Sequence, residues 1–142
     1  MARRSRHRGE AAEGHAEAIH KQLLEARPAG VEMPQLMRST ERTHSQIRSG
    51  LAMLRDVIAK KGRPPLRYSR ADAYQYTSDP VELQEYEVRV VRQILTLIRR
   101  LITGTVISHA ALYPEDRWVR HLVAQLKAVE TILDNIAPQN GS

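Results

Sequence analysis

Residues 38–56, RSTERTHSQIRSGLAMLRD, decide the fold, because their character changes halfway along. The first half is polar and has almost no bulky apolar side chain. In the second half Ile47, Leu51 and Leu54 recur at helical spacing, with arginines between them. Thr43 and Gln46 have the S/T-x-x-E/Q spacing of a capping box, in which each side chain accepts a hydrogen bond from the other's backbone N–H. The stretch therefore predicts a helix over 43–58 with one buried stripe and a basic, exposed back.

The positive charge of the chain is concentrated around this helix. The 142 residues have a formal net charge of +6, all of which lies in residues 1–80. Residues 38–70 hold nine lysines and arginines against two acids, whereas residues 81–142 are neutral. A charge run is most often a solvated surface, but so uneven a segment favours a polyanion as partner.

The segments around the helix predict the rest of the N-terminal half. Arginines among small residues predict a disordered basic tail over 1–13, and a first helix is expected over 14–27. A short helix opens at Pro34. After residue 62, apolar and polar residues alternate on both sides of SRADA (69–73), which predicts a β-hairpin with Arg70 near its tip and Arg67 on one arm. Its tyrosines are expected in the core and at the base of the hairpin.

The C-terminal half predicts two longer helices. Asp79 and Pro80 are a capping acid and a first-turn proline, and they open a helix expected to reach residue 103, with a short helical or irregular link after Gly104. The last helix begins after Pro114, with Trp118 as its anchor and apolar residues at heptad spacing. We expect a homodimer, with the fold-back of both helices on their own domain as the alternative. The expected interface residues are Leu97, Leu101, Val119, Leu122, Leu126, Val129 and Leu133.

The order of helix, short helix, longer basic helix and hairpin resembles the winged helix-turn-helix superfamily over residues 14–79. The residues that carry the resemblance are VEMPQLM (31–37), THSQIRSGLAML (43–54) and RPPLRYSRADAYQYT (63–77). The link RSTERT (38–43) lacks the glycine often seen in that turn. The whole chain also resembles the actinobacterial RacP-like proteins. The resemblance implies a mainly α fold: a winged helix-turn-helix domain of three helices plus a two-stranded β-hairpin wing. C-terminal dimerisation helices (80–137) and a tail (138–142) would follow.

The resemblance further implies that helix 43–58 lies in the major groove of double-stranded DNA. Opposite the buried stripe, base contacts are expected from His44, Ser45, Arg48 and Ser49. Phosphate contacts are expected from Arg38, Ser39, Thr40, Arg42 and Arg55, and wing contacts from Arg67 and Arg70. The expected function is a dimeric transcriptional regulator that reads a palindromic site. An architectural or plasmid- or chromosome-maintenance DNA-binding protein with low sequence preference stays open, as does a winged-helix protein-interaction module.

Other classes of function find no support in the sequence. There is no cysteine, the six histidines have no metal-ligand spacing, and no glycine-rich phosphate loop is present. We therefore expect no enzyme, no cofactor and no metal site. No apolar run approaches the ~18 residues of a membrane span, so a cytoplasmic, nucleoid-associated protein without a membrane partner is expected. No sequence feature calls for a small-molecule effector.

Overall fold

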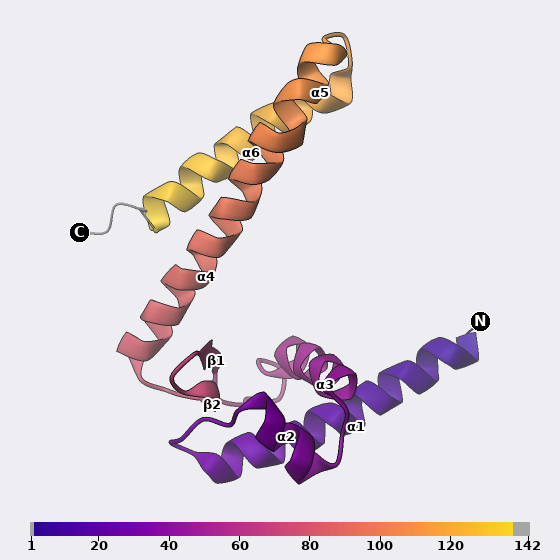
Figure 1. Ribbon diagram of the computed structural model, residues 1–142, viewed down its shortest axis with the longest axis vertical. Helices are drawn as coiled ribbons and strands as arrows, with labels where there is room; N and C mark the ends of the chain where they lie inside the picture. The colour runs from indigo at the N-terminus through magenta and orange to yellow at the C-terminus, as the bar shows by residue number, and fades with distance from the viewer. Residues whose placement is uncertain (1, 138–142) are drawn as a thin grey trace. The chain divides into compact units, whose positions relative to one another are not determined.

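Helix α3 (His44–Val57) packs with its apolar stripe on helix α1 (Ala2–Ala26) in the computed structural model, which describes residues 2–137, with side chains from Gly9 onward (Figure 1). Ile47, Leu51 and Leu54 are buried, as predicted. They form one core with side chains of α1, of helix α2 (Met33–Thr40) and of the hairpin. The chain is mainly helical and has one small antiparallel sheet. It divides into two compact units, with the boundary between residues 83 and 84.

The predicted disordered tail over 1–13 is wrong for the described residues, because α1 begins at Ala2 rather than near Gly14. Ala12 is buried and lies four residues before Ala16, which continues the apolar stripe of Ala16, Ile19 and Leu23 towards the N-terminus. The turn around Ala12 is therefore packed, and the residues before it continue the same helix. The side chains of the first eight residues, and the predicted tail over 138–142, lie outside the described residues.

The connection between α2 and α3 turns without a glycine. Glu41 adopts the left-handed conformation, with φ 54° and ψ 45°, and the N–H of Arg42 bonds the carbonyl of Met37 at 3.0 Å. The capping box is confirmed. The Thr43 hydroxyl accepts from the Gln46 N–H at 3.2 Å, and the Gln46 side chain accepts from the Thr43 N–H at 2.9 Å. The start of α3 is thus fixed by its own sequence.

The predicted hairpin is confirmed as strands β1 (Leu66–Ser69) and β2 (Ala73–Tyr76), which pair antiparallel. Val31 adds a one-residue bridge to β2: its N–H donates to the Tyr74 carbonyl at 2.7 Å, and the Tyr74 N–H donates back at 3.1 Å. Gly30 permits this approach, because a Cβ there would overlap the carbonyl oxygen of Asp72. The hairpin is therefore held directly against the α1–α2 connection.

The second unit is a helical hairpin. Helix α4 (Pro80–Leu101) passes through a π turn, η1 (Ile102–Val106), into α5 (Ile107–Leu112), and α6 (Arg117–Ile136) runs back beside α4 (Figure 1). Of the two forms expected for the link after Gly104, helical or irregular, the structure has the helical one, and the π turn keeps backbone hydrogen bonding continuous into α5. No helix within the described residues combines the length and apolarity needed to cross a membrane.

Candidate nucleic-acid interface

The outer face of α3 presents the four side chains expected to contact bases. His44, Ser45, Arg48 and Ser49 are all exposed, on the side of the helix away from the buried stripe. Arg55 continues this face one and a half to two turns further on. This division follows from the sequence itself, because at 3.6 residues per turn the polar positions fall opposite Ile47 and Leu51.

A groove separates this face from the β-hairpin. One hollow of about 450 Å³ is lined by α3, Met33 and Tyr74, and an adjoining hollow of about 360 Å³ lies nearer the hairpin tip. The two hollows share Met33, His44 and Tyr74, so they form one channel, here called the α3–hairpin groove. Arg48 and Arg55 line one part of it and Arg70 the other. Glu32 lines the same part as Arg70, so the uncompensated positive charge of the groove lies in the part beside α3.

Tyrosines line the hairpin side of the groove. The rings of Tyr68 and Tyr74 lie 4.9 Å apart between centroids, and Tyr68 is exposed, not buried at the hairpin base as predicted. Tyr76 is in the core, as predicted, and its hydroxyl is 2.7 Å from the His20 Nδ1. Burial raises the pKa of Tyr76 to about 12. Burial also lowers the pKa of His20, with the Arg63 charge as a smaller cause.

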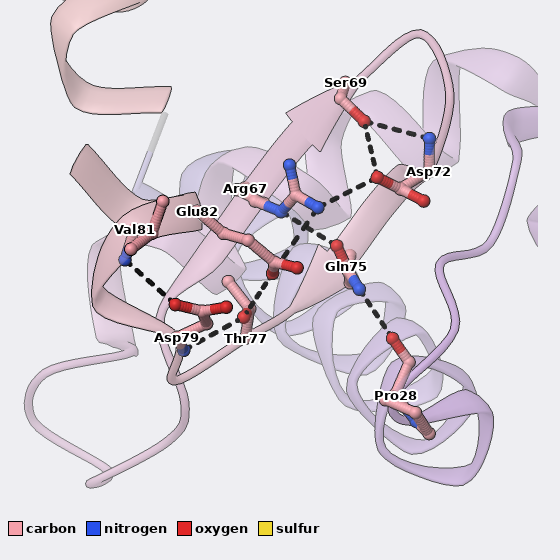
Figure 2. A network of polar contacts seen from close by, with 9 residues as sticks. All are labelled: Pro28, Arg67, Ser69, Asp72, Gln75, Thr77, Asp79, Val81 and Glu82. Carbon is pink, nitrogen blue, oxygen red and sulfur yellow. Dashed lines mark hydrogen bonds and ion pairs between the residues drawn. The ribbon is translucent and has the colours of Figure 1, made fainter. Parts of the chain in front are cut away.

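Arg67, expected as a wing contact, is buried in a polar network. Its guanidinium is buried and donates to Gln75 Oε1 at 2.8 Å and to Asp72 Oδ2 at 2.9 Å (Figure 2). A second ion pair reaches Glu82 at 3.5 Å. The register pairs Arg67 directly with Gln75, so both side chains lie on the same face of the sheet, opposite the core face that carries Leu66 and Tyr76. Arg70, at the exposed tip, is the remaining wing arginine.

The same polar network joins the hairpin to the first turn of α4. The Thr77 hydroxyl donates to Glu82 Oε2 at 2.7 Å, and Asp79 caps the helix by accepting from the Val81 N–H at 2.9 Å (Figure 2). The Gln75 amide donates to the carbonyl of Pro28, which ties in the end of the α1 region. The hairpin is therefore braced from both sides before the chain enters α4.

Arg42 was expected to bind phosphate and is instead held inside the protein. Its Nε donates to His15 Nδ1 at 2.6 Å, and its other nitrogens donate to the carbonyls of Thr40 and Gly14 at 3.0 and 3.5 Å. The pKa of His15 is lowered, first by burial and then by the Arg42 charge. The Thr40 hydroxyl donates to the carbonyl of Leu36 at 2.6 Å and is likewise engaged. Arg42 therefore fixes the α2–α3 turn on α1.

The basic residues of 38–70 thus fall into two groups. Lys61 and Arg63 both bind Glu17, and these two hydrogen bonds, with Lys61 the larger cause, lower the pKa of Glu17 to about 2. With Arg42 and Arg67, four of the nine cations are occupied internally. Across the part of the chain that the structure describes, five side chains have no such partner: Arg38, Arg48, Arg55, Lys60 and Arg70. Ser39 is exposed beside Arg38, with a long 3.5 Å bond to the Leu36 carbonyl.

The expected dimer seam on α6 is partly used within the chain. Val119 is completely buried, and half-buried Leu122, Leu126 and Leu133 share its stripe. Val119 is therefore unavailable to a partner, because α6 folds back on the rest of its own unit. Leu97, Leu101 and Val129 of the expected interface are exposed. The prediction for Trp118 is wrong: it is 62% exposed and anchors nothing in the described chain.

Comparisons with known proteins add no assignment: no family model, curated protein or solved structure matches the chain. Within residues 2–137, no three histidine or acidic side chains gather where they would hold a metal ion. The site described so far therefore consists of one exposed helix face, a cationic groove and a hairpin tip.

Proposed function

We propose that this chain is a winged helix-turn-helix protein that binds double-stranded DNA sequence-specifically, with α3 in the major groove. The observation that carries the proposal is the outer face of α3, where Arg48 stands free among three hydrogen-bonding side chains opposite a buried stripe. Such a face at the first turns of a helix fits the edges of bases. Arg48 is the best candidate for a bidentate guanine contact, worth about 1–3 kcal/mol of discrimination.

The arrangement around α3 supports the winged-helix assignment. The element order is three helices with a bridge at Val31 before α2, and then a hairpin whose second strand receives that bridge. The α3–hairpin groove separates the exposed face of α3 from the hairpin. A hairpin that acts as a wing needs such a separation in order to flank a duplex bound by α3. Arg70 at the tip would then contact phosphate or the minor groove.

The division of the cations sets the expected salt dependence. Each neutralised phosphate contributes about −0.9 to the slope of log K against log salt. If each of the five free cations of residues 38–70 neutralised one phosphate, the slope would be about −4 to −5 per subunit, whereas all nine would give about −8. A titration of binding between low and moderate salt measures this slope.

Selection of bound sequences from a random duplex pool tests the proposal. Wild type should enrich one motif, and Arg48→Ala should lose preference at a position of that motif. Arg38→Ala should weaken all sites alike and reduce the salt slope by about 0.9. Arg120→Ala, an exposed arginine on α6, is the charge-matched control and should change neither. Unaltered site preference in Arg48→Ala would show that α3 is not the reading helix.

One observation favours low sequence preference as the second candidate. Among the five free cations, Arg38 and Arg55 lie where phosphate contacts are expected and Arg70 at the hairpin tip, whereas Arg48 alone lies where bases would be read. An architectural or maintenance protein would bind in this way. The same selection decides, because such a protein enriches no discrete motif, and its footprint covers DNA broadly instead of protecting separate palindromes. A protein-interaction module would shift no duplex at about 100 mM salt.

A further inference from the structure

Helices α4 and α6 each carry a second apolar stripe that does not face the other helix. On α4 it comprises Ile94, Leu97 and Leu101, and on α6 Val129, Ile132 and Ile136, with the same spacing of three and then four residues. All six side chains are between 38% and 64% exposed. The core of the hairpin is made by other residues, among them Leu95, Ile102 and Val119.

The two second stripes lie on the same side of the hairpin. Leu95 marks the side of α4 that faces the core. Because successive residues are turned by about 100° around the helix, the second stripe of α4 lies to one side of Leu95 and Arg99 lies to the other. On α6, by the same measure, the stripe falls on the flank away from Glu130 and Asp134. Arg99 pairs with Asp134 at 3.3 Å and with Glu130 at 3.7 Å, so these charged flanks coincide. The apolar flanks therefore coincide as well and form one face.

This surface, here called the apolar face, also includes Trp118, which lies eleven residues before Val129 and hence on the same stripe. The neighbouring stripe positions, Val90 on α4 and Gln125 on α6, are uncharged. Arg100 borders the face beside Leu97, but residues 81–142 as a whole are neutral, so two copies do not repel each other through their net charge. Among the side chains that the structure describes in the first unit, the exposed large hydrophobics are Leu24, Tyr68 and Val81, which lie on three different elements.

The size of the apolar face matches a dimer. Aromatic side chains bury about 150–250 Å² each; with roughly the same area for the aliphatic members, the exposed fractions of the seven side chains amount to roughly 700 Å² per copy if the partner covers all of it. Two copies would bury roughly 1,400 Å², within the range of stable, specific interfaces. A two-helix hairpin has one shared core layer, and pairing with a second hairpin provides the enclosed core of a four-helix bundle.

We propose that a second copy of this chain covers the apolar face, so that two α4–α6 hairpins form a two-fold symmetric four-helix bundle. The interface is isologous, since each copy presents the same patch. Three residues of the interface expected from the sequence belong to it: Leu97, Leu101 and Val129. The stripe through the buried Val119 does not, and its place is taken by Ile94, Trp118, Ile132 and Ile136. Its consequence for DNA, two α3 helices on a palindromic site, rests on the proposed function; the dimer itself does not.

Sedimentation equilibrium on the full chain tests the proposal. Wild type should have twice the 16.2 kDa mass of one chain. Leu97→Glu should give single chains with unchanged helix content, because this side chain is already exposed within one copy. Leu97→Ala, which adds no charge, should raise the dimer dissociation constant at least about tenfold. Leu24→Glu on α1, an exposed leucine outside the apolar face, is the matched control and should stay dimeric.

Two results would overturn the proposal: single chains for wild type at 100 µM, or a Leu97→Glu variant that stays dimeric. DNA binding is measured separately on the same samples. If wild type is dimeric but binds no duplex, the proposed function fails and the dimer stands. If Leu97→Glu is a single chain that binds a half-site as wild type does but no longer prefers a palindrome, both stand.

Discussion

Replacing Gly50 by alanine should destabilise the first unit, although alanine is the better helix former. Gly50 is buried in α3, where a Cβ would lie 2.7 Å from Ile19 Cδ1, 2.8 Å from His15 Cβ and 3.0 Å from the His15 carbonyl carbon. The end of the isoleucine can rotate away. The two His15 atoms belong to the α1 backbone or its first side-chain carbon, so α1 and α3 must move apart.

Two opposing terms set the size of this effect. Overpacking a tight contact costs about 1–3 kcal/mol, and the gain from glycine to alanine in a helix is about 1 kcal/mol. The expected net loss is about 1 kcal/mol, which lowers the melting temperature of a domain of this size by roughly 4–8 °C. Gly14→Ala in α1 is the matched control, because its Cβ would meet nothing within 4 Å. It should gain about 0.5–1 kcal/mol.

The assay is urea unfolding followed by circular dichroism, with tryptophan fluorescence as a second signal. Trp118 is the only tryptophan and lies in the second unit, so its transition should not move in either variant. If Gly50→Ala stabilises the protein as much as Gly14→Ala, α1 and α3 do not pack closely at this point. The close packing that positions α3 on α1 would then be refuted.

Three further perturbations have expected outcomes. Glu41→Gly should raise the free energy of unfolding by roughly 0.5–1 kcal/mol, measured by urea midpoints, because glycine adopts the left-handed conformation without strain. The pKa of His15 is lowered by burial and by Arg42. The stability that neutral His15 contributes to the folded state is therefore complete above pH 6.5 and is lost as the pH falls through the folded-state pKa. His15→Gln keeps an acceptor for Arg42. In unfolding titrations at several pH values, this variant should lose the part of the acid destabilisation that comes from His15 and keep the part that comes from His20. Gly30→Ala should cost about 3 kcal/mol or more and remove hydrogen-exchange protection from the Val31 bridge; full protection would contradict the close backbone approach.

Local signals in the sequence predicted the parts of the fold that depend on near neighbours. The Thr43–Gln46 capping box and the buried stripe from Ile47 to Leu54 involve residues three to seven positions apart, and both are confirmed. The partners of the internal cations lie much further away: His15 is 27 residues from Arg42, and Glu17 is 44 from Lys61. No local pattern reveals such pairs, so a charge count over 38–70 overstates the cations that a ligand can reach.

The heptad spacing on α6 predicted a seam but not what it faces. The same spacing serves a helix of the same chain and a helix of another copy equally well. Here the stripe through Val119 turns inward, and the parallel stripe through Ile132 and Ile136 is the one left exposed. Which of the two stripes faces the chain's own core depends on the direction of the turn after α5, and that direction is set by tertiary structure.

The π turn between α4 and α5 gives the chain one place where its length can change harmlessly. There the N–H of Ile107 bonds the carbonyl of Ile102, five residues back, so this turn holds one residue more than regular winding accommodates. A one-residue deletion elsewhere in α4 would rotate all later residues of the helix by about 100° around its axis. Val106 would then no longer point into the core of the α4–α6 hairpin. A deletion inside this turn leaves both flanking segments in phase. Descendants of this chain can therefore shorten by one residue at Gly104 and keep the same helix pairing.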